Sequence, residues 1–287
     1  MSAAPRVAVL TVTYNTGETI RPFLDSIAHA SATPVPVVVA DNGSADLDAL
    51  RAIAESHGAV VVSSGSNRGY GGGIDAAFSA LDDLLPDVRP EFVLVTNPDV
   101  VFHPGSIDEL VAAADRLPRG GSFGPQILDE HGDTYPSARQ LPSLRTGLGH
   151  AAFSRFWPGN PWSQRYWSTT LVEERTAGWL SGACFLIRTS LFRELDGFDE
   201  SYFMYFEDVD LGQRVGASGH DNVYVPTAVV VHTGAHSTSS NRRRMEVEHH
   251  RSAYRFLSRK YRAWWLWPLR LVLHAGLSIR ARWVTRK

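Results

Sequence analysis

Three side chains far apart in this sequence are of types that could carry chemistry together. Asp99 lies three residues after the apolar stretch 92–96, and such carboxylates hold divalent cations that bridge a nucleotide diphosphate. Asp208 lies in the acidic cluster 207–210 behind a run rich in aromatics, where partial desolvation raises a carboxyl pKa toward that of a general base. His232 ends a valine-rich stretch and could complete a metal site with Asp99. The structural alternatives are helix capping for the carboxylates and a core position for the histidine.

Short apolar stretches alternate with amphipathic ones through the first hundred residues. The predicted strands are 7–13, 35–40, 59–63 and 92–96, and the predicted helices are 18–30, 46–57 and 74–85. This alternation predicts βαβ units and an α/β fold with a mostly parallel sheet. In the second half we expect a hairpin around 131–133, strands at 183–187 and 223–232, and a helix at 207–217, while 142–170 predicts no element.

Polar side chains follow every predicted strand of the first half. They are Thr13, Tyr14 and Asn15; Asp41, Asn42 and Ser44; Asn67 and Arg68; and Asn97 and Asp99. In open parallel sheets, ligands bind outside the carboxyl ends of the strands. Four such ends together favour a binding site over turns and helix caps alone.

The glycines of 69–73 could let the backbone approach a diphosphate or could form a flexible turn. They follow the third strand, whereas a dinucleotide fingerprint follows the first. No P-loop is present, since the chain's only lysines are Lys260 and Lys287. The sequence therefore disfavours an NAD enzyme and a P-loop NTPase.

The chain's 287 residues are 44% hydrophobic, and its one cysteine, Cys184, excludes a disulfide framework. Charge is uneven: 242–287 holds 13 basic and two acidic residues, while 1–241 holds 15 basic and 28 acidic ones. We expect a catalytic domain at 1–241 and a basic, tryptophan-rich helical extension at 242–287 that meets an anionic membrane surface or a second subunit. No secretory signal begins the sequence, and the apolar run 263–279 is too short and too charged to span a bilayer.

In combination, these motifs resemble the inverting glycosyltransferases of family 2, which have the GT-A fold. The similarity covers about residues 6–260 and rests on T-Y-N at 13–15, D-N-x-S at 41–44, the glycine stretch 67–73, a variant D-x-D at 97–99 and E-D at 207–208. Where many members have an asparagine, this chain has Asp75.

The resemblance implies a role for each matched residue. It implies nucleotide-sugar binding by Thr13, Tyr14, Asn15, Asp41, Asn67, Arg68, Gly69, Asn97 and Asp99. It implies acceptor binding by Trp179, Gly182, Glu207, Arg242 and Arg243. It also implies that Asp99 and His232 hold Mg²⁺ or Mn²⁺ and that Asp208 is the catalytic base.

Within the family, the motifs are similar to those of rhamnosyltransferases of cell-wall linker assembly. That similarity implies dTDP-L-rhamnose as donor, N-acetylglucosaminyl-diphosphoryl-polyprenol as acceptor, and a peripheral place on the cytoplasmic face of the membrane, with a homodimer also open. Alternatives are a galactofuranosyl- or other hexosyltransferase using a UDP-sugar, a sugar nucleotidyltransferase, and a non-catalytic membrane-docking module. Nucleic-acid binding is disfavoured because the acidic body would repel a duplex.

Overall fold

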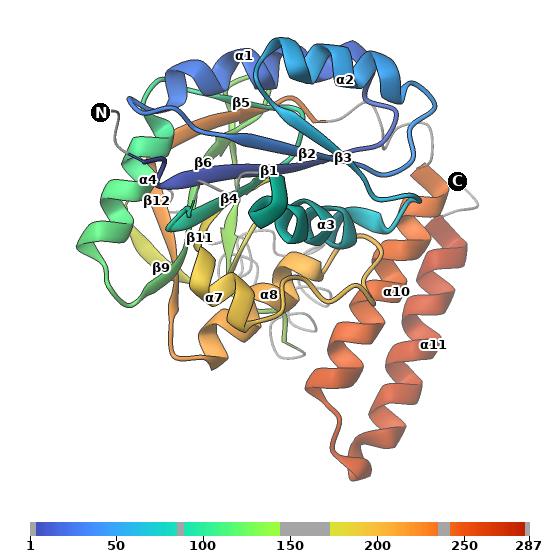
Figure 1. The fold of residues 1–287 in the computed structure, drawn as a ribbon. Coiled ribbons are helices and arrows are strands. Elements are labelled where there is room, and N and C mark those ends of the chain that lie inside the picture. The colour runs from blue at the N-terminus through green and yellow to red at the C-terminus, as the bar shows by residue number, and fades with distance from the viewer. Residues whose placement is uncertain (1–3, 85–88, 144–172, 235–241, 285–287) are drawn as a thin grey trace.

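The computed structural model describes residues 4–84, 89–143, 173–234 and 242–284. A mostly parallel sheet lies between two layers of helices, and a helical hairpin projects from one end of this body (Figure 1). The expected GT-A-like α/β architecture is confirmed. Most of 142–170, where no element is predicted, lies outside the described residues.

The four strands predicted in the first half are present and parallel. They are β1 (Val7–Thr13), β2 (Val37–Asp41), β3 (Val60–Ser63) and β4 (Phe92–Thr96). Between them run the 3₁₀ turn η1 (Gly17–Ile20) and the helices α1 (Arg21–Ala30), α2 (Leu47–Ser56) and α3 (Gly69–Leu84). The predicted helix 18–30 thus begins as a 3₁₀ turn, because Pro22 suits the first turn of an α-helix but not its interior.

Alternation along the buried strands supplies both faces of the sheet with apolar side chains. In β1, Val7 and Val9 pack with α1, α2 and α4 (Ser106–Arg116), whereas Ala8 and Leu10 pack with α3, α7 (Thr189–Glu194) and α8 (Glu207–Ala217). The sequence of a strand that is covered on both faces is a continuous apolar run, and such runs made these strands predictable.

The second half extends the sheet through strands of mixed direction. These are β5 (Val100–Phe102), β6 (Gly120–Leu128), β11 (Cys184–Arg188) and β12 (Asp221–His232), and the order is β3-β2-β1-β4-β11-β6-β12-β5. The predictions of 183–187, 207–217 and 223–232 are confirmed within two residues. Strands β5 and β6 are not predicted, because β5 has three residues and β6 opens with two glycines. A Cβ at Gly120 would lie 2.3 Å from the Phe123 ring, so tight packing requires glycine there.

Four short strands complete the body. They are β7 (Thr134–Tyr135), β8 (Ala138–Arg139), β9 (Arg175–Ala177) and β10 (Trp179–Leu180). β7 pairs antiparallel with β6 and confirms the hairpin expected around 131–133, while β8 pairs with β10 and β9 pairs with β12.

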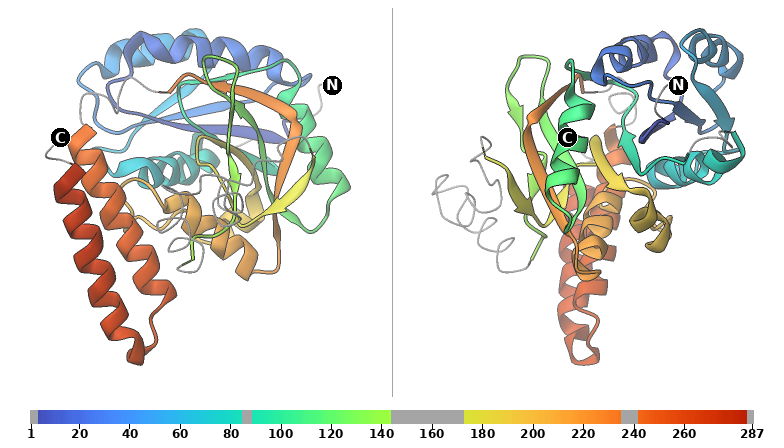
Figure 2. Two further views of the ribbon diagram at one scale, coloured as in Figure 1. Left: turned by 180° about the vertical axis from the view of Figure 1, so that it is seen from behind. Right: turned by 60° about the vertical axis from the view of Figure 1, so that its left-hand side comes forward.

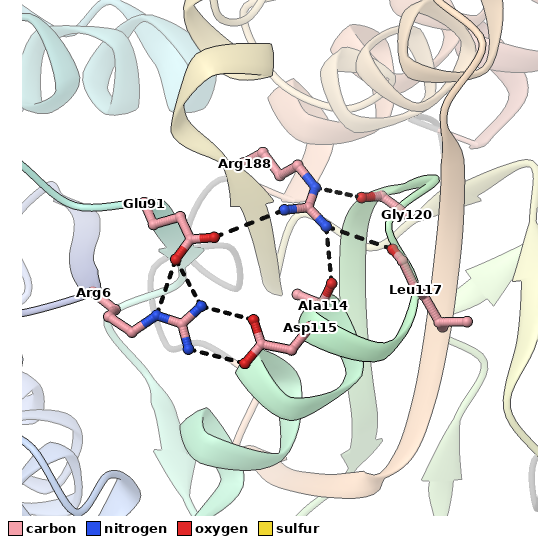
Figure 3. Close-up of polar contacts among 7 residues, drawn as sticks. All are labelled: Arg6, Glu91, Ala114, Asp115, Leu117, Gly120 and Arg188. Atoms are coloured by element: carbon pink, nitrogen blue, oxygen red, sulfur yellow. Dashed lines mark hydrogen bonds and ion pairs between the residues drawn. The ribbon is translucent and has the colours of Figure 1, made fainter.

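A network of charged groups fixes the amino-terminal edge of the sheet (Figure 3). Arg6 forms paired hydrogen bonds with Glu91 and with Asp115. Arg188 donates to three backbone carbonyls where α4 ends, those of Ala114, Leu117 and Gly120. The Ala114 carbonyl lies in the last turn of α4, where a helix leaves its carbonyls without intrahelical partners. The network ties β1, β4, β11 and α4 together at the edge opposite the predicted site.

The C-terminal segment forms two helices that lie side by side, α10 (Arg242–Lys260) and α11 (Trp267–Val284), joined through the 3₁₀ turn η2 (Trp264–Leu266) (Figures 1 and 2). α10 joins the body through a small apolar cluster in which Phe256 packs with Tyr202 and Val209. Among the described residues, no helix has both the length and the apolarity needed to cross a bilayer. The proposed boundary at 241/242 stays a prediction.

Candidate active site

The predicted polar residues gather at the carboxyl edge of the sheet. Thr13 and Asp41 end the neighbouring strands β1 and β2, and Asn97 follows β4. The antiparallel register of β5 with β12 pairs Val100 with His232, which puts the residue before Val100 beside the imidazole. Strand pairing therefore brings positions more than 200 residues apart to one edge.

Asp99 and His232 form a close pair there. The imidazole Nε2 lies 3.1 Å from Asp99 Oδ1 and 3.2 Å from Asn97 Nδ2. In the tautomer that carries its proton on Nδ1, the imidazole has the Nε2 lone pair available as a metal ligand. One imidazole and one carboxylate fit Mn²⁺ or Mg²⁺ when diphosphate oxygens and water complete the shell. Within the described residues, no third His, Cys, Asp or Glu joins the pair.

The turn at Ser181–Ala183 links this pair to the acidic cluster. Ala183 carbonyl oxygen accepts from the backbone N–H of Asn97 at 2.9 Å. One residue earlier, the Gly182 N–H donates to Asp208 Oδ2 at 2.9 Å. A single turn thus contacts both Asn97 and Asp208, and Gly182 positions the Asp208 carboxylate.

The three carboxylates of the acidic cluster have different environments. Asp210 is paired with Arg214 at 2.7 Å. Glu207 is buried, and its Oε2 has no hydrogen-bond partner in the part of the chain that the structure describes. Burial together with the Asp208 charge raises the pKa of Glu207 well above the usual range. Asp208 is only partly buried, and desolvation raises its pKa although the N–H groups of Gly182 and Val209 oppose the shift. Of the three, Asp208 alone combines an accessible carboxylate with the basicity that proton abstraction needs.

Tyr70 fixes the other end of the Gly182 peptide group. Its hydroxyl donates to the Gly182 carbonyl oxygen at 2.5 Å. Burial and the nearby Glu207 and Asp208 charges raise the pKa of Tyr70 well above its usual value, so the hydroxyl stays protonated. Tyr70 therefore holds the turn whose N–H holds Asp208. Its position within the glycine stretch was the only sequence signal for this role.

Asp41 is fully buried at the end of β2. Its Oδ2 accepts from the N–H groups of Gly43 and Ser44, both at 3.0 Å, which fixes the carboxylate. Its Oδ1 has no hydrogen-bond partner among the described residues. Buried polar atoms are rarely left unpaired, so this oxygen is suited to accept from a ligand hydroxyl or base N–H.

Several predicted donor-binding residues use their side chains to hold loops. Asn15 Oδ1 accepts from Ala45 N–H, and Asn67 Oδ1 accepts from Gly69 N–H, both at 3.0 Å. Arg68 forms an ion pair with Glu200. Tyr14 is 45% exposed, and the Thr13 hydroxyl lies 3.4 Å from the Ala40 carbonyl oxygen. Direct donor contact by these residues stays a prediction.

The glycine stretch packs elements together and is not a flexible turn. Helix α3 begins at Gly69, five residues before the predicted start at 74, so the stretch is its first turn. Gly69 has φ +80°, and a Cβ there would lie 2.0 Å from the Phe203 carbonyl oxygen. A Cβ at Gly73 would lie 2.2 Å from Val12 Cγ2. These positions let α3 approach both β1 and the segment that precedes α8.

That preceding segment, 199–206, is held by α10. Tyr205 and Phe206 have φ of +65° and +69°, an uncommon backbone conformation for aromatic residues. The His249 ring lies 5.4 Å and 5.6 Å from their two rings, and the Ser252 hydroxyl donates to the Met204 carbonyl oxygen at 3.0 Å. Contacts from the C-terminal hairpin therefore support the strained residues immediately before Glu207.

Asp75 contacts the chain just before segment 199–206. It accepts from the Phe198 N–H at 3.0 Å, and burial raises its pKa to about 7. Next to it, Gly197 has φ +61°, and a Cβ there would lie 2.3 Å from Asp75 Oδ1. Asp75, which stands where many family members have an asparagine, therefore holds the loop at 197–198.

The predicted acceptor residues lie in two places, beside α8 and at the start of α10. Trp179 lies on β10 beside α8, and its indole N–H donates to the Gln140 carbonyl oxygen at 3.2 Å. Arg139, which sequence reasoning missed, places its guanidinium 5.1 Å from the Tyr135 ring centroid and 5.4 Å from that of Trp179, and its charge opposes the rise in the Asp208 pKa. Arg243 lies exposed at the start of α10, and the side chain of Arg242 lies outside the described residues.

Comparison with known families decides the class. Residues 5–249 match the model described as "Glycosyltransferase like family 2". The chain belongs to this family. The chain is 44% identical to an N-acetylglucosaminyl-diphospho-decaprenol L-rhamnosyltransferase of Mycobacterium tuberculosis, over 97% of this chain and 92% of that one. It is 24% identical to the rhamnosyltransferase WbbL of Escherichia coli K12, over 88% and 93% of the two chains.

Solved structures show the same fold at low identity. A mannosyltransferase of Pyrobaculum calidifontis, in complex with GDP-Man and Mn²⁺, matches with a TM-score of 0.58 and 19% identity, over 99% of this chain and 73% of that one. S. aureus TarS 1–349 matches with a TM-score of 0.55 and 17% identity, over 90% and 72% of the two chains. The family-2 chain is therefore a GT-A-like glycosyltransferase.

Proposed function

We propose that this family-2 enzyme transfers L-rhamnose from dTDP-L-rhamnose to N-acetylglucosamine linked through a diphosphate to a polyprenol. The observation that carries the proposal is the 44% identity to the mycobacterial L-rhamnosyltransferase across nearly the full length of both chains. Such identity, without large unmatched regions, supports a shared donor and acceptor class. The natural reaction would then belong to cell-wall linker synthesis, at the inner face of the cell membrane.

The geometry supports direct displacement with inversion. Asp208 would take the proton from the acceptor hydroxyl as that oxygen attacks the anomeric carbon of the donor, and the nucleoside diphosphate would leave from the opposite face. Gly182 orients the carboxylate through its N–H, and burial supplies the basicity. No covalent enzyme intermediate is required.

Asp99 and His232 would hold the donor's diphosphate through a divalent cation. The ion, Mg²⁺ or Mn²⁺, would neutralise charge that develops on the leaving diphosphate. The pair's carboxylate and imidazole suit either metal. Asp41, with its unpaired Oδ1, would accept a hydrogen bond from the nucleoside.

A donor and acceptor panel tests this proposal. The purified enzyme is incubated with dTDP-L-rhamnose or with UDP-hexoses, with and without a polyprenyl-diphosphate-linked N-acetylglucosamine, in Mg²⁺, Mn²⁺ or EDTA. We expect metal-dependent release of dTDP that requires the acceptor. Preferential turnover of a UDP-sugar would replace the donor assignment, and no transfer from any sugar nucleotide would refute the proposal.

A further inference from the structure

Exposed apolar side chains are concentrated at the turn of the C-terminal hairpin. Trp264, Trp265 and Trp267 are 77%, 64% and 56% exposed, and Leu271, Val272 and Ile279 on α11 are more than half exposed. Outside the hairpin, only Tyr14 and Tyr135 are exposed large hydrophobics in the described part of the chain. Burying three tryptophans would be favourable, so a cluster of this kind indicates contact with a partner or an interface.

The charges around this turn are positive. Arg262 precedes the tryptophans and is exposed, and Arg270 follows them in the first turn of α11. The acidic residues of 242–287, Glu246 and Glu248, both lie near the start of α10, at the opposite end of that helix from the turn. Tryptophan beside arginine is typical of side chains at the boundary between lipid headgroups and hydrocarbon.

The turn has a defined shape and is not a frayed end. The guanidinium of Arg270 donates to the carbonyl oxygens of Tyr261 and Ala263, at 3.1 Å and 3.0 Å, and so closes the connection between the helices. Tyr254 of α10 packs edge-to-face on His274 of α11, with ring centroids 4.9 Å apart. The tryptophans are therefore presented on a braced hairpin whose turn lies away from the sheet (Figures 1 and 2).

Helix α10 of the hairpin also contacts the segment that leads to Asp208. Arg259 pairs with Asp199, and Ser252 and His249 contact residues 204–206 immediately before α8. One helix thus carries the exposed turn at its end and contacts the segment leading to Asp208 along its length. A surface bound by the turn would be held at a fixed orientation to the site.

We propose that the hairpin turn, residues 262–272, docks on an anionic lipid bilayer surface and thereby presents the site to an acceptor embedded in that bilayer. This inference rests on the proposed function, because only a lipid-linked acceptor gives such docking a use. Charge favours anionic lipid over a contact between the turns of two copies: residues 262–272 carry Arg262 and Arg270 and no carboxylate, so two such turns would repel each other. Docking lowers KM for the embedded acceptor and leaves the chemistry of transfer unchanged.

The test compares the full chain with a variant carrying Trp264→Ala, Trp265→Ala and Trp267→Ala. Vesicle flotation uses phosphatidylcholine alone or mixed with phosphatidylglycerol. We expect the wild-type chain to bind the anionic vesicles, to lose binding at high salt, and to bind at least about tenfold less when the tryptophans are removed. Arg262→Glu weakens binding, whereas Arg119→Glu, the same charge change at the opposite edge of the sheet, does not.

Kinetics separate this proposal from the assignment of function. With acceptor in anionic vesicles, the tryptophan variant shows a KM raised at least about tenfold; with a short, water-soluble acceptor its kcat and donor KM match the wild type. Equal vesicle binding by the tryptophan variant and the wild type overturns the docking proposal. The proposal is also overturned if light scattering shows that the tryptophan variant has lost a dimer while its vesicle binding and kinetics are unchanged. Absence of transfer by the wild type to either acceptor refutes the proposed function, while flotation still decides docking.

Discussion

Replacing Asp208 with asparagine tests the role of the base with little disturbance to the fold. The asparagine carboxamide oxygen can still accept the Gly182 N–H that now binds Asp208 Oδ2 at 2.9 Å. What the variant loses is the negative charge, the ability to take a proton and the hydrogen bond that Oδ1 accepts from the Val209 N–H. General-base catalysis contributes about 10²–10⁴-fold, and we expect about 10³-fold here, equal to about 4 kcal/mol of barrier.

Glu207→Gln is the matched control, because it changes the neighbouring carboxyl in the same way. Burial raises the pKa of Glu207 well above its usual range, which favours its neutral form, and glutamine keeps the size and the lack of charge of that form. We expect kcat to fall less than about tenfold in this variant. Asp208 must be ionised to act, so wild-type kcat/KM should fall as pH drops through its raised pKa.

The assay is single-turnover transfer with saturating donor, beside calorimetric titration of dTDP. Asp208→Asn should bind dTDP with wild-type affinity and fail in the chemical step. If Asp208→Asn retained more than a tenth of wild-type turnover, or if Glu207→Gln were the more damaged enzyme, Asp208 would not be the base.

Three further changes probe the groups around the base. Asp99→Asn should weaken Mn²⁺ binding at least about tenfold by electron paramagnetic resonance in the presence of dTDP, and unchanged affinity would remove it from the metal site. Tyr70→Phe should lower kcat about tenfold through a loosened Gly182 turn while donor KM stays constant, and an effect on KM alone would contradict that role. Asp75→Asn should have the melting temperature of the wild type near pH 4 and a progressively higher one than the wild type toward pH 7. The reason is that the folded pKa of Asp75, about 7, lies above the unfolded value, so the wild type loses stability as pH rises across that interval and the variant does not. A pH-independent difference in melting temperature would show that Asp75 does not titrate in this way.

The parts of the fold that could be predicted are those whose pattern is local. Strands such as β1 and β4 are continuous apolar runs buried on both faces, and α8 begins at the predicted Glu207 because three carboxylates suit its first turn. Strand β6 could not be predicted, since its Gly121 is required by the side chains of Leu191 on α7 and Val215 on α8, which no local window contains.

The same limit applies to the site. The motif positions identified Asp99, Asp208 and His232, and the structure brings Asp99 beside His232 through the β5–β12 register. The turn that ties them to Asp208, and the Tyr70 hydroxyl that holds this turn, depend on contacts between residues 26 and 112 positions apart. Their roles could be read only once the chain was folded.

The support that α10 gives to residues 204–206 was also hidden in the sequence. A basic, tryptophan-rich tail predicts an interface, but nothing in its composition says that His249 and Ser252 brace the strained aromatics before Glu207. The C-terminal extension is therefore joined to the catalytic body more closely than a separate appendage would be.

The anomeric configuration of the sugar in the first-formed product tests the central claim most directly. Nuclear magnetic resonance of the glycosylated acceptor, compared with the donor, distinguishes one displacement from two. Attack by an acceptor oxygen activated by Asp208 predicts the configuration opposite to that of the donor. A product that retains the donor configuration would require a covalent or front-face mechanism and would contradict the account.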